Sequence, residues 1–346
     1  MNPLEGILEQ VRTAFVPDIR SGVFDLRVEE RAGALALTGQ TTHPEAVHKV
    51  IELLRRDRGL PVSDEVVRLP DAALGEGSAA LVRSAVAPIY AEPRLPAPQI
   101  SQVVLGMRVD VLSSADGWVR IRGEDGYIGW VNEGYLAIGD AAWARGWERG
   151  IGGEPVVSIG AELVDDDGRW LMRLPWGARL LRRAGAYFLP DGRSGQLGAG
   201  EVLDVDRLAD WFPARGESIA RTARRWLGAP YLWGGVTLNG VDCSGFAQAV
   251  MWMHGVALPR DSDLQARVGA RVDSGGDRSD VRPGDLLFFA ESGDRVSHIA
   301  IAIGGSTIIH SALANGGVAV NDLDGPLPFE QRLRNLYTHA QRLLPD

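Results

Sequence analysis

The feature that most restricts the fold of this chain is a series of short alternating segments, separated by Asp-Gly pairs, between residues 81 and 138. Alternation of apolar and polar residues is typical of half-buried strands, and Asp-Gly is favoured in tight hairpin turns. The segments are VRSAVAPIYAEP, MRVDVLSSADG, WVRIRGEDG and YIGWVNEGYL. Strands this short, joined by such tight turns, predict a small β-barrel over residues 81–140.

The regions on either side of this barrel have their own patterns. The segment DDDGRWLMRLPWGARLL repeats the order of Asp-Gly turn, tryptophan and basic strand, and it predicts a second small barrel over residues 150–208. Ahead of the first barrel, two stretches with helical spacing, residues 4–15 and 44–56, alternate with the strands FDLRVEE, GALALTGQ and EVVRLP. Residues 1–75 are therefore expected to form a small α/β module, and we assign no chemistry to it.

Residues 213–346 combine helices with a run of strands. The helix ESIARTARRWLG precedes the loop APYLWGGVTLNGVDC, and a second helix is expected from about Ser244 to His254. The strands that follow are DLLFFA, SHIAIAIG, TIIHSA and LYTHAQRLL. Two helices followed by antiparallel strands predict an α+β domain.

Composition excludes several classes of function. The chain has 346 residues and a formal net charge of −9, which disfavours nucleic acid as the main partner. Its only lysine, Lys49, follows no glycine-rich loop, which excludes a Walker-type phosphate site and argues against a pyridoxal enzyme. The single cysteine, Cys243, can form neither an intramolecular disulfide nor a structural zinc cluster. No metal or organic cofactor is implied.

The sequence also carries no sign of export. The first twenty residues include Glu5, Glu9 and Arg12 and have no apolar run of signal-peptide length. No later stretch approaches the roughly 18 uninterrupted apolar residues of a membrane span. We therefore expect a cytoplasmic protein without a membrane span.

The chemistry is expected around Cys243, which follows the glycine-rich loop at the start of a predicted helix. Unpaired N–H groups at a helix start favour the thiolate, so the pKa of this thiol is expected to be depressed. His298 and His310 lie in two successive predicted strands, and a three-residue turn after Ile303 places both imidazoles on one face of these strands. This trio predicts a thiol nucleophile with an imidazole base. The alternative is a buried cysteine among core histidines.

Together these segments resemble the NlpC-type cysteine peptidases. The resemblance is carried by YLWGGVTLNGVDCSGF, LPRDSDLQ, RPGDLLFF, SHIAIAIG and IIHSA, and it covers residues 213–346, while DGYIGWV followed by GYL resembles bacterial SH3 domains. The resemblance implies a papain-like α+β catalytic domain preceded by two SH3-like barrels. It makes Cys243 the nucleophile, His298 the general base and His310 the residue that orients His298. The residues that it implies for the substrate cleft are Tyr231, Asp242, Ser244, Arg260, Asp261 and Ser262.

The activity that the resemblance implies is hydrolysis of the γ-D-glutamyl to diamino acid bond of cell-wall stem peptides. In recycling members with this architecture, a glutamate and a tyrosine of the first SH3-like domain recognise the free amine of an N-terminal L-alanine, and Glu92 and Tyr127 match these positions. The expected partners are thus murein stem peptides that carry a free N-terminal L-alanine. Two alternatives remain: another papain-like thiol amidase or acyltransferase, and a catalytically inactive protein that binds wall fragments.

Overall fold

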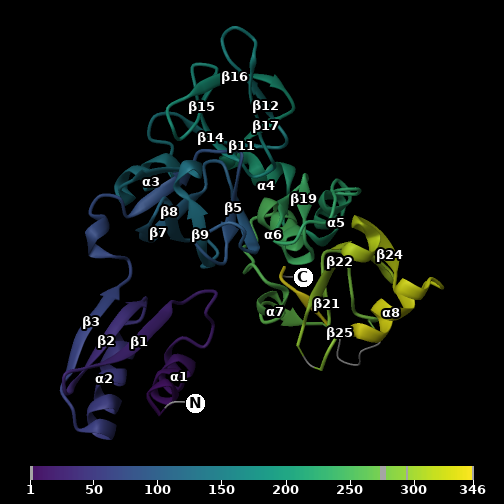
Figure 1. Cartoon of the computed structure of the whole chain (residues 1–346). Helices are drawn as coiled ribbons and strands as arrows, with labels where there is room; N and C mark the ends of the chain where they lie inside the picture. Colours follow the sequence, from purple (N-terminus) through teal and green to yellow (C-terminus); the bar gives the residue numbers. More distant parts are fainter. Residues whose placement is uncertain (1–2, 273–277, 294, 345–346) are drawn as a thin grey trace.

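Figure 1 shows a computed structural model of the chain, in which residues 3–272, 278–293 and 295–344 are described. A small N-terminal module (purple) lies below a first seven-stranded sheet (blue), and a second seven-stranded sheet (teal) lies at the top. The C-terminal domain, in green and yellow, lies to the right of both. Within the described residues, every helix is too short or too polar to cross a membrane.

The N-terminal module packs two helices on a three-stranded sheet. The helices are α1 (Pro3–Phe15) and α2 (Pro44–Arg58), and the strands are β1 (Phe24–Arg31), β2 (Ala34–Thr41) and β3 (Val62–Arg68). β2 is the central strand, antiparallel to β1 and parallel to β3, since α2 provides the crossover that a parallel pair needs. The apolar face of α2, with Val47, Val50 and Leu54, is buried in one cluster with Leu35 and Leu37 of β2.

A small apolar cluster attaches this module to the first seven-stranded sheet. Its buried members are Val23, Leu69, Leu112 and Ile128. The loop at residues 16–23, which connects α1 to β1, is held at the same junction, because the N–H of Ile128 donates to the carbonyl of Arg20 at 2.7 Å. This loop is therefore fixed against the sheet rather than free in solvent.

The first seven-stranded sheet contains the short strands that the Asp-Gly pattern predicted. They are β4 (Ala79–Val82), β5 (Val86–Tyr90), β6 (Gln99–Val104), β7 (Arg108–Ala115), β8 (Trp118–Arg122), β9 (Ile128–Asn132) and β10 (Leu136–Gly139). Asp116 and Gly117 connect β7 to β8 with φ values of 50° and 77°, the positive values that a tight hairpin turn of this kind requires. The helix α3 (Ala141–Glu148) follows.

The second seven-stranded sheet occupies the region of the weaker repeat. Its strands are β11 (Glu154–Ser158), β12 (Glu162–Val164), β13 (Trp170–Arg173), β14 (Arg179–Arg183), β15 (Ala186–Phe188), β16 (Ser194–Ala199) and β17 (Val202–Asp204). The predicted turn at Gly168, with φ of 76°, connects β12 to β13. A short helix, α4 (Leu208–Trp211), leads to the C-terminal domain.

The C-terminal domain has the α+β arrangement that its pattern predicted. Its helices are α5 (Gly216–Arg224), α6 (Cys243–Met253), α7 (Ser262–Gln265) and α8 (Pro328–Leu336). A hairpin of β18 (Val236–Thr237) and β19 (Gly240–Val241) precedes α6. The main sheet has the order β20-β25-β21-β22-β23-β24, with β20 (Ala270–Arg271), β21 (Leu286–Phe289), β22 (His298–Gly304), β23 (Thr307–Ala312), β24 (Gly317–Asp322) and β25 (Tyr337–Arg342).

The core of this domain places α6 against the middle of the sheet. Phe246 and Val250 of α6 are fully buried in one cluster with Ile299, Ile301 and Ile309 of β22 and β23. Because side chains alternate along a strand, the residues between these isoleucines point to the other face of the sheet. This packing brings the start of α6 close to the start of β22.

Candidate active site

Cys243 is the first residue of α6, at the point where the glycine-rich loop meets the helix. Asp242 caps this helix, since its Oδ1 accepts a hydrogen bond from the N–H of Gly245 at 2.7 Å. Position 245 requires glycine, because a Cβ there would lie 2.2 Å from the carbonyl oxygen of Gly235. The loop thus packs tightly against the helix and fixes the thiol at the helix start, where the sequence predicted it.

The two histidines come together on neighbouring strands. His298 begins β22, His310 lies in β23, and Ile301 faces Ile309 in the antiparallel register that the sequence predicted. The predicted three-residue turn after Ile303 is wrong, because Gly304 pairs with Thr307 and leaves only two residues in the turn. A bulge between Ala302 and Gly304 compensates and preserves the predicted register from Ala302 back toward His298. Nε2 of His298 lies 2.6 Å from Nδ1 of His310, so the prediction that both imidazoles share one face is confirmed.

A hydrogen-bonded chain behind the histidines sets their protonation. Nε2 of His310 lies 3.0 Å from Oδ1 of Asn321, and this oxygen also accepts from Nδ2 of Asn315 at 2.8 Å. A carboxamide oxygen only accepts, so Nε2 of His310 carries a proton, and Nδ1 of a neutral His310 must accept from Nε2–H of His298. This leaves Nδ1 of His298 without a proton, as a general base requires.

Burial controls the ionisation of these groups. It raises the pKa of the half-buried Cys243 thiol to about 12, and the charge of Asp242 adds to this effect. It also lowers the pKa of His310 to about 4 and that of His298 well below its usual value, with a contribution from His310. The predicted depression of the thiol pKa is therefore wrong, because loss of hydration outweighs the helix start. The resting pair is a neutral thiol and a neutral imidazole.

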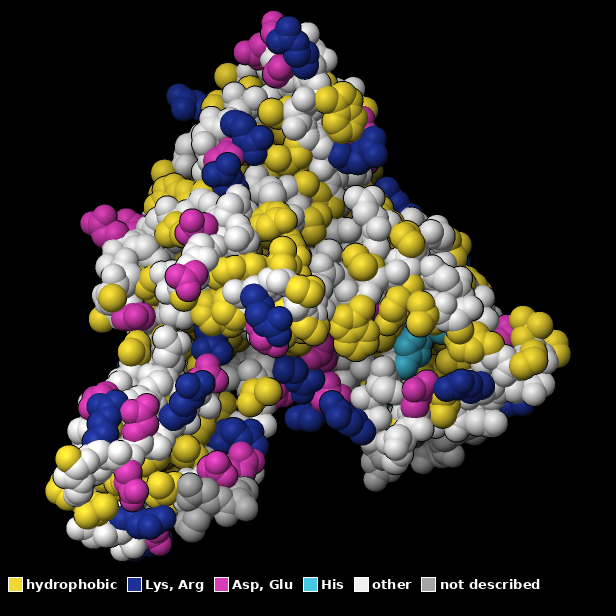
Figure 2. Space-filling view, in the orientation of Figure 1, with side chains coloured by type: hydrophobic (Ala, Val, Ile, Leu, Met, Phe, Trp, Pro, Cys, Tyr) yellow, Lys and Arg dark blue, Asp and Glu magenta, His cyan; other side chains and the backbone are white. Residues whose placement is uncertain are grey.

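The thiol lies in a cleft of about 1020 Å³ that residues from several parts of the chain line. In Figure 2 the surface is hollowed between the N-terminal module and the C-terminal domain, with charged side chains gathered at the inner end of the hollow. Burial raises the pKa of Tyr231 to about 12, so its hydroxyl stays protonated and can donate a hydrogen bond. The predicted substrate-binding residues that line the cleft are Tyr127, Tyr231, Asp242, Ser244, Asp261 and Ser262.

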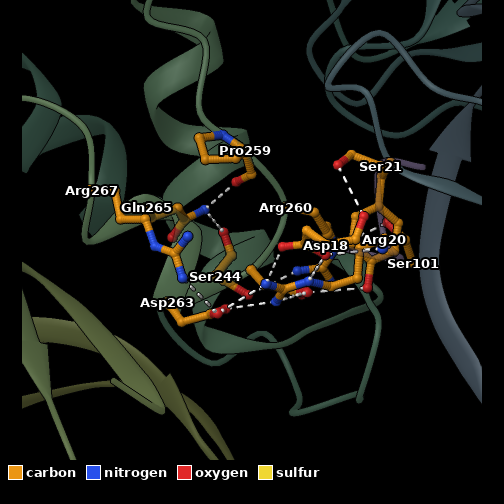
Figure 3. Close-up of polar contacts among 12 residues, drawn as sticks. Asp18, Arg20, Ser21, Ser101, Ser244, Pro259, Arg260, Asp263, Gln265 and Arg267 are labelled. Atoms are coloured by element: carbon orange, nitrogen blue, oxygen red, sulfur yellow. Dashed lines mark hydrogen bonds and ion pairs between the residues drawn. The ribbon is translucent and has the colours of Figure 1, made fainter. Parts of the chain in front are cut away.

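Arg260, which the sequence analysis assigned to the cleft, lies behind it. This residue is only 1% exposed, and its guanidinium donates to Oδ1 and Oδ2 of Asp242 at 3.0 and 2.6 Å. It also donates to the hydroxyls of Ser244 at 2.8 Å and of Ser101, in β6, at 2.9 Å (Figure 3). The assignment of Arg260 to substrate binding is therefore corrected: Arg260 fixes the helix cap and connects α6 to the first sheet.

Glu92 also lies outside the cleft. It is exposed just after β5, and its carboxylate accepts a hydrogen bond from Nε of Arg94 at 2.7 Å. Tyr127, by contrast, lines the cleft, and its hydroxyl donates to Oδ2 of Asp261 at 3.1 Å. The carboxylate that accompanies Tyr127 in this structure is thus Asp261, not Glu92.

Two residues of the site were not predicted from the sequence. Asn321, which holds the tautomer of His310, occupies a buried position of β24, and an asparagine at an inward position of a strand is the signal that could have indicated it. Arg20 lines the cleft and donates to Oδ2 of Asp261 at 2.8 Å. The two residues are 241 positions apart, so no local pattern indicates this contact.

Comparison with known proteins agrees with this geometry. Residues 228–336 match the NlpC/P60 family, and residues 89–136 match the bacterial dipeptidyl-peptidase SH3 domain. The gamma-D-glutamyl-L-lysine dipeptidyl-peptidase of Bacillus cereus is 28% identical over 265 residues, which are 71% of this chain and 75% of that protein. The protein of the same name from Bacillus subtilis is 40% identical over 97 residues, 28% of this chain and 31% of that protein.

A solved structure shows a similar fold. The crystal structure of an NlpC/P60 family protein from Bacillus cereus matches with a TM-score of 0.64 and 25% identity, covering 78% of this chain and 100% of that one. The matched domains contain the thiol at the start of α6 and the paired histidines of β22 and β23. The peptidase domain, residues 228–336, therefore belongs to the NlpC/P60 cysteine peptidase family, and a bacterial dipeptidyl-peptidase SH3 domain, residues 89–136, lies ahead of it.

Proposed function

We propose that this peptidase hydrolyses the γ-D-glutamyl to diamino acid bond of cell-wall stem peptides whose N-terminal L-alanine is free. One observation carries the proposal: a single cleft contains the thiol of Cys243, the base His298 and the carboxylate of Asp261 beside Tyr127. The names of the two Bacillus relatives, gamma-D-glutamyl-L-lysine dipeptidyl-peptidases, support the same bond.

In this proposal the carboxylate of Asp261 binds the ammonium group of the substrate. Its side chain is 28% exposed, so a bound peptide would remove it from water. Burial raises the pKa of Tyr127, which keeps its hydroxyl protonated and donating to Asp261. An acetylated amine carries no charge and would leave Oδ1 of this carboxylate without a donor in a closed cleft, which is unfavourable. Asp261 thus takes the role that the sequence analysis gave to Glu92.

The reaction follows from the protonation of the trio. Nδ1 of His298 accepts the proton of the thiol while the sulfur of Cys243 attacks the carbonyl carbon, and the backbone N–H groups of Ser244 and Ile299 favour the sulfur anion that develops. The protonated imidazole then donates its proton to the leaving amine, and a thioester remains. Water activated by His298 hydrolyses the thioester and restores the thiol. The N–H of Cys243, at the helix start, is our candidate donor to the oxyanion.

The need for a free L-alanine amine also indicates which kind of reaction must produce the substrate of this enzyme. A peptide whose L-alanine nitrogen is still acylated lacks the ammonium group, so a hydrolysis that frees this amine must come first. We therefore place this enzyme in the recycling of released wall fragments in the cytoplasm, not in the cutting of polymer.

Defined peptides test the proposal. The substrate L-Ala-γ-D-Glu-diamino acid, made with either diaminopimelate or lysine, should yield L-Ala-D-Glu and the free diamino acid by mass spectrometry. The isomer with an α-linked glutamate should remain intact, and Cys243→Ser should be inactive while its circular dichroism is unchanged. Absence of cleavage of both γ-linked peptides by wild type would overturn the proposal. Formation of a new amide with an added amine, in place of hydrolysis, would show an acyltransferase instead.

A further inference from the structure

Arg20 extends from the N-terminal module into the cleft of the peptidase domain. Its guanidinium donates to Asp18, to Oδ2 of Asp261 at 2.8 Å, and to both carboxylate oxygens of Asp263 at 2.7 and 2.9 Å. Figure 3 shows Arg20 joined to Asp18 and Asp263 by dashed lines. Its backbone is held as well, because its carbonyl accepts from the N–H of Ile128 in the first sheet. Arg20 is thus fixed at both ends.

We propose that Arg20 is a positioning residue for amine recognition, and that the N-terminal module is therefore part of the substrate site. This inference rests on the proposed function. Oδ2 of Asp261 already accepts two hydrogen bonds, one from Arg20 and one from the hydroxyl of Tyr127. Among the described residues no side chain or N–H donates to Oδ1. Arg20 and Tyr127 together orient Asp261 so that this second oxygen is available to an ammonium group.

The charges around Arg20 agree with a role in holding a cation site. One guanidinium contacts three carboxylates, those of Asp18, Asp261 and Asp263. Arg267 lies 3.8 Å from Asp263, and Arg295, which also lines the cleft, acts on the same carboxylate. The hydrogen bonds of Arg20 lower the pKa of Asp18 and of Asp263. These carboxylates therefore stay ionised and hold Arg20, while Oδ1 of Asp261 is left for the substrate amine.

The same contacts allow an opposite role, which the experiment separates. If Arg20 occupied the place of the substrate ammonium, it would have to leave before substrate binds, and its removal would raise activity. If it positions Asp261, its removal lowers activity. The geometry favours positioning, because Arg20 is held by three carboxylates and by its own carbonyl rather than by Asp261 alone.

The test compares full-length Arg20→Ala with Arg31→Ala on the free tripeptide and on its N-acetylated form. Arg31 is the matched control, because it lies in the same module in exposed ion pairs with Glu29 and Glu65. Arg20→Ala should lower kcat/KM for the free tripeptide by about tenfold to 100-fold, the effect of one charge-assisted hydrogen bond, mainly through a higher KM. It should leave the acetylated peptide unaffected. Arg31→Ala should match wild type with both peptides.

One further measurement and two further variants keep the outcome decisive. Alkylation of Cys243 by iodoacetamide should proceed at the wild-type rate in Arg20→Ala, since the catalytic trio is intact. If Arg20→Ala does not fold, Arg20→Gln, which removes the charge but keeps an amide donor, carries the same comparison. Arg20→Lys, which keeps the charge without the planar fork, should retain an intermediate preference for the free amine.

The failures are distinguishable. If wild type cleaves the free and acetylated peptides equally, amine recognition is absent and the proposed specificity fails together with this inference. If wild type prefers the free amine and Arg20→Ala keeps that preference, only the role of Arg20 is overturned. A gain of activity in Arg20→Ala would also overturn it, in favour of a blocking role.

Discussion

Replacement of Asn321 by leucine tests the proton arrangement of the catalytic site most directly. The two side chains are similar in size, so the change removes the acceptor of Nε2–H of His310 and leaves little cavity. The buried donor of His310 then lacks its partner. The alternative tautomer, in which Nδ1 of His310 donates to His298, is no longer disfavoured. In that form Nδ1 of His298 holds a proton and cannot accept one from the thiol.

The magnitude follows from the energy of one buried hydrogen bond. A buried donor left without a partner costs about 1 to 3 kcal/mol. In the variant the active tautomer carries this cost, whereas the alternative tautomer offers Nε2 of His310 as an acceptor to Nδ2 of Asn315, 3.4 Å away. The active tautomer therefore becomes the minor one, and kcat should fall by about fivefold to about 150-fold, at a factor of ten per 1.4 kcal/mol. KM should change little, since Asn321 is 7% exposed and is not among the residues that line the cleft.

The assay is steady-state hydrolysis of the free tripeptide, with Asn315→Ala as the matched control. Asn315 donates to the same Oδ1 of Asn321, but its removal leaves the acceptor of His310 in place, so we expect less than about a threefold change. Both variants should be checked by urea denaturation. If Asn321→Leu is folded and its kcat equals that of Asn315→Ala, the tautomer of His310 does not depend on Asn321 and the reasoning is refuted.

Two further predictions concern stability. His298 and His310 have pKa values in the folded protein below the usual 6.5, and that of His310 is about 4. The unfolded chain therefore binds protons that the folded chain does not as pH falls below about 6.5. The unfolding free energy should drop by up to about 1.4 kcal/mol per pH unit for each histidine. Urea denaturation at pH 7 and at pH 5 should show this loss of unfolding free energy in the wild type. His310→Gln has one buried histidine fewer, so its unfolding free energy should fall less between the two pH values. The same pH dependence in the variant and the wild type would contradict this prediction. Arg260→Met should cost about 3 to 5 kcal/mol, because it leaves the buried carboxylate of Asp242 unpaired. Arg207→Met, which breaks an exposed pair with Asp210, should cost less than about 1 kcal/mol, and equal losses in the two variants would show that burial of the pair is not decisive.

Features that depend on local pattern could be predicted from the sequence. The alternation of the segments around β22 and β23 predicts that His298 and His310 share a face, although the bulge between Ala302 and Gly304, not the predicted three-residue turn, sets this register. The place of Cys243 follows similarly, because a glycine-rich loop and an aspartate precede an apolar helix. In both cases the residues that set the geometry are close in the sequence.

Features that depend on long-range contacts or on hydration could not be predicted. A motif gives the position of Glu92 but not the direction of its side chain, and Arg94, two residues later, pairs with it. Arg260 belongs to a motif next to the cleft, yet its contacts with Asp242 and with Ser101, 159 residues away, bury it. The thiol of Cys243 has a raised pKa because its surroundings exclude water, and these surroundings form only in the complete fold.

The cleft is assembled from segments that the ribosome makes at very different times. Arg20 is synthesised 241 residues before Asp261, and the N-terminal module has its own buried core, so it can fold while the peptidase domain is still absent. The thiol of Cys243 emerges before both His298 and Asn321. A nascent chain interrupted before β22 thus holds the nucleophile without its base. The order of synthesis therefore delays hydrolytic activity until translation has passed β24.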